Sequence, residues 1–295
     1  MTPHETISND ERGTAGHCQW QLRTRSLTFA GLPAIMGIVN VTPDSFSDGG
    51  QHAAPQQAIA HALRLEDAGA EILDIGGEST RPYSPSVSPE EELRRVVPVL
   101  EGLVGRVQCA LSIDTSKSRV AAAAIDLGVE IINDVTGLEG DPAMLPLAVA
   151  TQSGVCAMHM QGTPATMQDA PHYDDVVQEI FQYLQQRRDR LLAGGVAASR
   201  ICLDPGIGFG KTHAHNLQLI QAAERFLELG CPLLIGHSRK GFIGKLLGDK
   251  QLSRDMGSLG ISLALAARGV HVLRVHDVAS TRQALVCFAA AGGLG

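Results

Sequence analysis

Residues 201–211, ICLDPGIGFGK, contain the parts of a unit that recurs along the chain. An apolar run leads to Asp204, and Pro205 then ends strand pairing because it has no N–H to donate. The three glycines that follow permit backbone conformations that a side chain would forbid. The pattern indicates a buried strand that delivers a carboxylate to a ligand, with backbone held close beside it.

The same stretch has two other interpretations, a nucleotide-binding P-loop and a plain structural loop. The P-loop pattern G-x-x-x-x-G-K-[ST] requires glycine at the position of Pro205, and Gly206 lies one residue too close to Lys211. The rest of the chain decides between these interpretations.

From residue 34 onward the unit occurs eight times, as an apolar run, a polar or glycine-rich turn and a helical pattern. The expected strands are 34–41, 71–77, 109–115, 130–135, 154–160, 200–206, 232–238 and 271–277. The expected helices lie near 55–68, 89–104, 117–127, 142–152, 174–193, 214–228, 255–268 and 279–291. Apolar strands that alternate with helices indicate a parallel sheet covered on its outer surface.

Eight units favour an α/β fold closed into a (β/α)8 TIM barrel over an open doubly wound sheet. Polar residues follow the apolar run of most strands, at the end where a barrel gathers its catalytic groups. These residues are Asn40, Asp114, Asn133 or Asp134, His159, Asp204, Ser238, Arg274 and His276. Residues 18–33 alternate in polarity and predict a short hairpin beneath the barrel. We expect 1–17 to be a disordered tail and 18–295 a single catalytic domain.

Composition narrows the class of partner. The formal charge of −7 and the isoelectric point near 5.9 argue against nucleic acid and anionic membranes, which select an excess of Lys and Arg. The six cysteines form no C-x-x-C pair and several lie in apolar runs, as reduced thiols do. With no signal-peptide or membrane-spanning pattern, the cytoplasm is the expected location.

Asp114, Asn133 and Asp204 would converge on the barrel axis. A planar heterocycle with N–H groups suits two carboxylates and an amide, because buried polar groups need partners. Neighbouring backbone N–H groups are the alternative partners.

Cations also meet at the strand ends, and in an acidic protein they suit a phosphate or a diphosphate. They come from HSRK, from LRVHD and from the loop ESTRP, and the polar residues concerned are Ser238, Lys240, Arg274, His276 and Arg81. The alternative is a set of salt bridges to Asp114, Asp134, Asp204 and Asp277.

Two long loops, 40–50 and 76–91, are candidate lids over the site, although ordinary variable loops would have the same composition. His213 and His215 form an H-x-H pair, but no third ligand completes a zinc site. We expect both histidines at a solvent-facing helix start.

Eight motifs occur in the order found in the dihydropteroate synthases, enzymes of the folate pathway. They are MGIVNVTPDSFSDGG, DIGGESTRP, SIDTSK, IINDVTG, MHMQGTPATMQ, LDPGIGFGK, SRKGFIG and LRVHDV. The chain resembles this family from Trp20 onward. The resemblance implies a cytoplasmic barrel enzyme that dimerises through helices late in the chain. It also implies the condensation of p-aminobenzoate with 6-hydroxymethyl-7,8-dihydropterin diphosphate, with Mg²⁺ present and diphosphate released.

The resemblance further implies roles for individual residues. The pterin would bind Asp114, Asn133, Asp204 and Lys240. The diphosphate would bind Asn40, Thr80, Arg274 and His276, with Asn40 also near the metal. p-Aminobenzoate would bind Phe46, Arg81, Pro82, Phe209, Ser238 and Lys240. The expected catalytic residues are Asp114, Asp204, Lys240 and Arg274.

Physical chemistry agrees with these roles. Departure of diphosphate leaves a cationic methylene that Asp114 and Asp204 would stabilise where water is excluded. Mg²⁺, Arg274 and His276 would stabilise the departing anion. The arylamine already has a free lone pair near neutral pH, so positioning and charge stabilisation would carry most of the rate.

One departure from the family lies at Pro82-Tyr83, where relatives often have Pro-Gly, so Tyr83 is a candidate to narrow access to the p-aminobenzoate site. The first loop and the segment beside Phe209 keep the common forms, which predicts sensitivity to sulfonamides.

The nearest rival function is that of a pterin-binding methyltransferase domain, which needs neither a diphosphate site nor the SRK lysine. A non-enzymatic binding module would need neither lids nor converging cations.

Overall fold

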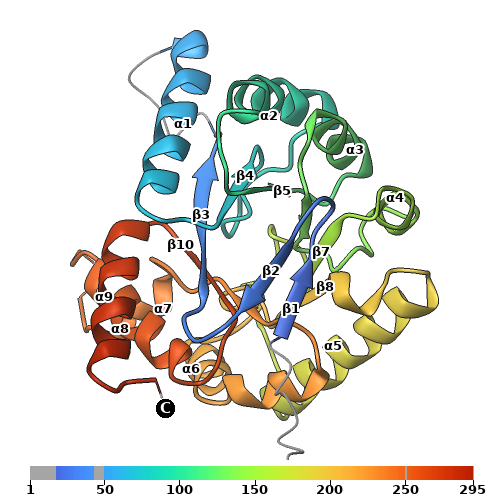
Figure 1. The fold of residues 1–295 in the computed structure, drawn as a ribbon. Helices are drawn as coiled ribbons and strands as arrows, with labels where there is room; N and C mark the ends of the chain where they lie inside the picture. The colour runs from blue at the N-terminus through green and yellow to red at the C-terminus, as the bar shows by residue number, and fades with distance from the viewer. Residues whose placement is uncertain (1–17, 43–49, 250, 295) are drawn as a thin grey trace, which may run out of the picture.

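The computed structural model describes residues 18–42, 50–249 and 251–294. Its barrel strands are β3 (Ala34–Asn40), β4 (Ile72–Gly76), β5 (Ala110–Asp114), β6 (Ile131–Asp134), β7 (Gly154–Met158), β8 (Ile201–Asp204), β9 (Leu234–Ile235) and β10 (Val272–Val275). They form one parallel sheet in the order β8-β7-β6-β5-β4-β3-β10-β9, with helices around its outer surface (Figure 1). The two edge strands, β8 and β9, meet and nearly close the predicted barrel.

That closure consists of one backbone hydrogen bond and one isolated bridge among the described residues. Leu203 N donates to Pro232 O at 2.9 Å, and Leu203 pairs with Leu233 in one parallel bridge. β9 is shorter than the expected 232–238 because the chain turns after it. Lys240 N donates back to His237 O at 3.4 Å, and Arg239 takes a positive φ of 58°. The turn places Ser238 and Lys240 at the carboxyl end of the barrel.

The helices follow the predicted rhythm with two differences. They are α1 (Gly50–Asp67), α2 (Pro89–Leu103), α3 (Ser118–Leu127), α4 (Met144–Thr151), α5 (Val176–Ala193), α6 (His213–Gln221), α7 (Gly241–Leu246), α8 (Asp255–Ala266) and α9 (Val278–Ala290). The helix expected at 214–228 ends at Gln221 and continues as a 3₁₀ turn, Ala223–Leu229. We did not predict α7, because its two glycines lower helix propensity. None of the described helices is both long and apolar enough to cross a membrane.

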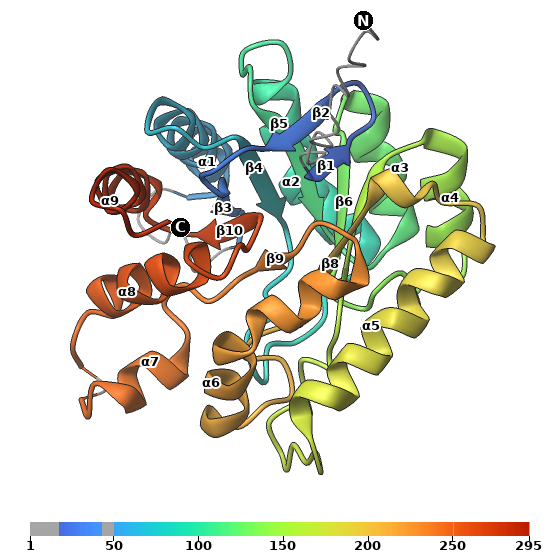
Figure 2. The ribbon, with the colours of Figure 1, turned by 60° about the horizontal axis from the view of Figure 1, so that its bottom comes forward.

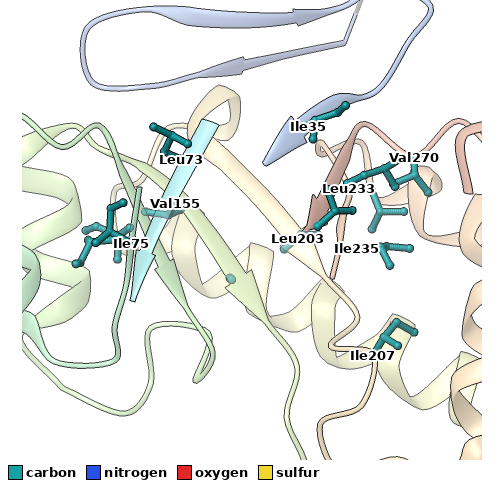
Figure 3. Close-up of a cluster of buried hydrophobic side chains, with 14 of the residues drawn as sticks. Ile35, Leu73, Ile75, Val155, Leu203, Ile207, Leu233, Ile235 and Val270 are labelled. Atoms are coloured by element: carbon teal, nitrogen blue, oxygen red, sulfur yellow. The ribbon is translucent and has the colours of Figure 1, made fainter. Parts of the chain in front are cut away.

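Buried apolar side chains form two clusters, one on each side of the barrel wall. Ile35, Leu73 and Val155 belong to the outer cluster, between the strands and the helices, part of which is shown in Figure 3. The inner cluster fills the amino-terminal half of the barrel. It consists of Trp20, Leu22, Ala34, Met36, Ile72, Ala110, Ile131, Cys156, Cys202, Leu234 and Val272. Neighbours such as Ile35 and Met36 fall in different clusters because side chains alternate along a strand.

The predicted hairpin closes the amino end of the barrel. β1 (Cys18–Gln21) pairs antiparallel with β2 (Ser26–Phe29), and Figure 2 shows the two strands lying across that end. Trp20 is fully buried in the inner cluster, and its Nε1 donates to Arg200 O at 2.9 Å. Arg200 in turn donates to Leu22 O at 2.6 Å. The tail predicted at 1–17 lies outside the described residues.

Candidate functional site

A buried polar layer replaces the apolar core in the carboxyl-terminal half of the barrel. Inward positions recur every second residue, so each strand adds a new inward side chain above the inner cluster. Along β4, β5, β6, β8 and β10 these side chains are Asp74, Ser112, Asp114, Asn133, Asp204 and Arg274. All but Arg274, which is partly exposed, are buried. Buried polar groups are costly unless they are paired, so their mutual contacts decide what the layer can bind.

Asp74 is the centre of this layer and is fully buried. Its carboxylate accepts from Ser112 Oγ at 2.6 Å, from Asn133 Nδ2 at 3.0 Å and from Arg274 Nε at 2.6 Å. We did not predict a role for Asp74, because we considered only polar residues at the last positions of the strands. The sequence did contain a signal for it. Asp74 is an acid inside the apolar run EILDIGG, two residues before Gly76, so both residues face the inside of the barrel.

Asp114 and Arg274 form a second ion pair beside Asp74. Arg274 Nη2 donates to Asp114 Oδ2 at 2.7 Å, so one guanidinium joins two carboxylates. Burial raises the pKa of Asp114 to about 7, although Arg274 lowers it. Burial lowers the pKa of the Arg274 guanidinium, but the two acids raise it above its usual value. Arg274 therefore stays charged, and one of the salt bridges considered as an alternative is present.

The open choice between Asn133 and Asp134 is resolved by the turn after β6. Asp134 accepts from Thr136 N at 2.8 Å, from Thr136 Oγ1 at 2.7 Å and from Leu138 N at 3.2 Å, so it stabilises that turn. Asn133 instead donates to Asp74 inside the barrel. Asn133 is therefore the member of this pair that faces the barrel interior.

Asp204 and Lys240 are the other two charged residues of the layer, and each shifts the pKa of the other. Asp204 Oδ1 accepts from Gly206 N at 2.7 Å, and burial raises the pKa of Asp204 while Lys240 lowers it. Lys240 Nζ donates to Ile207 O and lies 4.5 Å from the centroid of the Phe209 ring. Burial lowers the pKa of Lys240 to about 8, against the opposing effect of Asp204.

His276 and Ser238 meet on the neighbouring strand ends. His276 Nδ1 lies 3.0 Å from Ser238 Oγ, and His276 N donates to the same oxygen at 3.3 Å. Burial, together with the nearby charges of Arg239, Arg274 and Arg81, lowers the pKa of His276 to about 3. At neutral pH the imidazole is therefore uncharged and acts as a hydrogen-bonding group. A Ser238 hydroxyl that donates to Nδ1 leaves the ring proton on Nε2.

The remaining predicted residues surround this layer. Asn40 ends β3 and is partly buried, as are Thr80 and Phe209. Arg81 and Pro82 lie on the exposed loop between β4 and α2. Phe46 lies outside the described residues.

Three histidines have structural surroundings. His215 belongs to the first turn of α6, where its side chain and Thr212 form a capping box, and His213 starts the same helix, as predicted. His159 follows β7, and burial lowers its pKa to about 2. Within the described ranges, no group of three or more His, Cys, Asp or Glu side chains could hold a metal ion.

Comparison with known proteins agrees with this geometry. The model of the pterin binding enzyme family matches residues 36–276. The dihydropteroate synthase of Escherichia coli strain K12 is 47% identical over 253 residues, which cover 86% of this chain and 89% of that protein.

Two solved structures are also similar to the chain. The dihydropteroate synthase of Xanthomonas albilineans with 4-aminobenzoic acid has a TM-score of 0.88 and 46% identity, with 95% of this chain and 100% of that chain covered. The enzyme of Yersinia pestis in a sulfonamide drug complex has a TM-score of 0.86 and 44% identity, with 93% and 99% covered. The chain belongs to the pterin-binding enzyme family and, within it, to the dihydropteroate synthases.

Proposed function

We propose that the carboxyl end of the barrel joins p-aminobenzoate to 6-hydroxymethyl-7,8-dihydropterin diphosphate, forming 7,8-dihydropteroate and releasing diphosphate. The observation that carries the proposal is the buried polar layer, in which three acids and two cations replace the apolar core. Such a layer needs a polar ligand with both N–H donors and negative charge. The 4-aminobenzoic acid bound to the Xanthomonas albilineans enzyme supports p-aminobenzoate as the second substrate.

The pterin ring would lie against Asp114, Asn133, Asp204 and Lys240. Within the described residues, Asp114 Oδ1 and Asp204 Oδ2 accept no hydrogen bond, so one oxygen of each carboxyl can accept from a ligand N–H. Both oxygens of Asp74 already accept from protein donors, so we assign Asp74 as a positioning residue for Asn133 and Arg274.

The diphosphate would lie near Asn40, Thr80, Arg274 and His276. Arg274 uses two of its five N–H donors for the acids, and the others can reach phosphate oxygens. His276, held neutral, would donate from Nε2. Its contribution is directional, and the positive charge comes from Arg274.

The donor set fits a Mg²⁺ ion bound mainly by the substrate. Mg²⁺ commonly keeps several waters and phosphate oxygens and takes only one or two protein ligands. The Asn40 amide oxygen would be such a ligand. The ion would supply positive charge that stabilises the departing diphosphate.

p-Aminobenzoate would lie between Arg81 and Pro82 on one side and Phe209 with Ser238 on the other, and Phe46 stays a further predicted contact. Lys240, above the Phe209 ring, would lie where the pterin and the arylamine meet. The C–O bond to diphosphate breaks, and Asp114 and Asp204 stabilise the positive charge left on the pterin methylene. The amine lone pair then forms the C–N bond, and the amine loses one proton to solvent.

An assay of diphosphate release tests the proposal. Release should require both the dihydropterin diphosphate and p-aminobenzoate. Lys240→Ala and Asp204→Asn should each lower kcat/KM by several orders of magnitude, because each removes a charge that would contact the pterin. Near-native rates in either variant, or release without p-aminobenzoate, would contradict these roles. Competition between a sulfonamide and p-aminobenzoate is expected in the same assay.

We also propose a homodimer through α7, the loop after it and α8. Four large apolar residues are exposed there: Leu246 (60%), Leu247 (44%), Leu252 (52%) and Met256 (69%). Exposed apolar side chains gathered on one surface mark an interface. Met256→Lys should dissociate the dimer in sedimentation velocity, whereas Leu192→Lys on α5 should not. A Met256→Lys variant that stays dimeric would contradict this interface.

Two broader expectations stay proposals. The six cysteines are all free, which supports a reducing location such as the cytoplasm. The barrel strands and the hairpin share the inner cluster, which supports one catalytic domain over 18–295.

A further inference from the structure

The loop after β7, residues 159–175, contains most of the motif MHMQGTPATMQ, to which no role has been assigned above. It is anchored to the protein by two buried side chains, Met167 and Tyr173, which are 4% and 9% exposed. Between these anchors lie Gln168 and Asp169, which point to different neighbours. We call residues 159–175 the β7 loop.

One side of the β7 loop holds the turn after β8. Gln168 Nε2 donates to Gly208 O at 2.8 Å, and Tyr173 Oη donates to Gly210 O at 2.8 Å. These contacts lie on either side of Phe209. The β7 loop therefore fixes the backbone that presents the Phe209 ring.

A buried lysine adds a third contact to this side. Lys211 is 2% exposed, and its Nζ lies 3.0 Å from His159 Nδ1 and donates to Phe209 O at 2.8 Å. The burial of a lysine without a carboxylate partner is costly. The Lys211 side chain links the turn after β8 to the start of the β7 loop, and these contacts offset the cost of its burial.

Backbone packing shows how closely the two segments fit. A Cβ at Gly206 would lie 1.9 Å from His159 O, and one at Gly210 would lie 2.5 Å from Gln161 O. Both glycines have positive φ, 69° and 65°. A turn with such glycines has little rigidity of its own, so its shape depends on the β7 loop.

The other side of the β7 loop holds the loop between β4 and α2. Tyr83 N donates to Pro164 O at 3.0 Å, and Tyr83 Oη donates to Asp169 Oδ1 at 3.3 Å. Tyr83 has a φ of 64°, a conformation that costs roughly 1 kcal/mol for a residue with a side chain. It follows directly after Arg81 and Pro82. The two contacts offset the backbone cost and hold these residues toward the β7 loop.

We propose that the β7 loop positions both walls of the p-aminobenzoate site, with Gln168 holding the Phe209 wall and Asp169 holding the Arg81 wall through Tyr83. The inference rests on the proposed function, because it assigns p-aminobenzoate to the space between these walls. Gln168 and Asp169 are positioning residues. Gln168 acts through the backbone of Gly208, beside Phe209, and Asp169 acts through the side chain of Tyr83.

The first test is the variant Gln168→Met, which keeps the length of the side chain and removes the amide donor. The KM for p-aminobenzoate should rise roughly two- to tenfold, the effect of one lost hydrogen bond. The KM for the dihydropterin diphosphate and kcat should stay within about twofold. Gln185→Met, at an exposed position of α5, is the matched control and should change none of these values.

A purely structural role would give a different result. It would lower the melting temperature and affect both substrates, with no split between their KM values. Equal changes in both KM values, or no change in either, would overturn the proposal. Wild-type protein that releases no diphosphate with p-aminobenzoate would instead contradict the proposed function, so the two failures can be told apart.

A double-mutant cycle tests whether the loop joins the two walls. Tyr83→Phe removes the hydroxyl that contacts Asp169 and retains the ring. Because one loop holds both walls, the combined effect of Tyr83→Phe and Gln168→Met on the KM for p-aminobenzoate should be smaller than the product of the single effects. A combined effect equal to that product would show that the two contacts act independently, which would overturn the bridging role.

Discussion

Asparagine at position 74 is the sharpest test of the buried polar layer. Asp74 accepts three hydrogen bonds, and the one from Arg274 Nε at 2.6 Å is an ion pair. Asp74→Asn keeps the shape of the side chain and removes its charge. The oxygen that accepts from Asn133 and Arg274 can stay an oxygen, and Ser112 can turn to accept from the new NH2 group, but the negative charge that pairs with Arg274 is lost. The loss therefore falls mainly on the position of Arg274.

The expected magnitude follows from the partners that remain. Removal of one member of a buried ion pair costs about 3–5 kcal/mol, and a hydrogen bond to a charged group contributes about 1.5–3 kcal/mol. Arg274 retains Asp114 at 2.7 Å, so we expect a loss within the lower of these two ranges, about 2–3 kcal/mol. At 1.36 kcal/mol per factor of ten, kcat/KM for the dihydropterin diphosphate should fall about 30- to 150-fold.

The assay is diphosphate release with p-aminobenzoate saturating and the dihydropterin diphosphate varied. Ser112→Ala is the matched control, because it removes the neutral donor 2.6 Å from the same carboxylate. It should lower kcat/KM only about fivefold, a loss of about 1 kcal/mol, because the Asp74 charge and its ion pair with Arg274 stay in place. A melting curve for each variant shows whether it is folded. If Asp74→Asn stays within about threefold of the wild type, or equals Ser112→Ala, Asp74 does not hold Arg274 in place.

Three further predictions follow from burial and charge. Trp20→Ala should lower the free energy of unfolding by about 3–5 kcal/mol in urea, followed by circular dichroism, and leave kcat within about twofold, since the hairpin plugs the opposite end. kcat/KM for the dihydropterin diphosphate should rise as Asp114 loses its proton near pH 7 and fall as Lys240 loses its proton near pH 8. A kcat/KM that does not change across this pH range would contradict the roles of Asp114 and Lys240. Asp204→Asn combined with Lys240→Met should raise the melting temperature of the ligand-free protein while abolishing turnover; a lower melting temperature would show that the pair stabilises the fold.

The barrel could be predicted from the sequence because each strand is a local pattern. An apolar run such as ICLD and its polar end stay recognisable without knowledge of their neighbours, and all eight strands were expected within a few residues. β9 and α7 differ from the expected elements because the turn at Arg239 and the glycines of α7 are set by local backbone conformation. The hydrophobic pattern contains no sign of either.

The site was only partly predictable, for a physical reason. Asp114, Asn133 and Asp204 lie at strand ends, so their convergence follows from the fold alone. Asp74 lies inside a strand, and its importance depends on Arg274, which is 200 residues away in the chain. The contacts of Tyr83 with the β7 loop depend in the same way on two loops that no periodic pattern aligns.

The buried charges of Asp114 and Lys240 change the free energy of unfolding with pH. Asp114 has a folded-state pKa raised to about 7, so its contribution to stability is present at acid pH and is lost as the pH rises through that value. Lys240 has a folded-state pKa lowered to about 8, so its contribution is present at high pH and is lost as the pH falls through that value. Near neutral pH both charged forms therefore lower the stability of the ligand-free protein. A ligand that brings N–H donors to the acids and negative charge to the cations offsets that cost on binding, so the layer is best explained by the substrates and not by the fold.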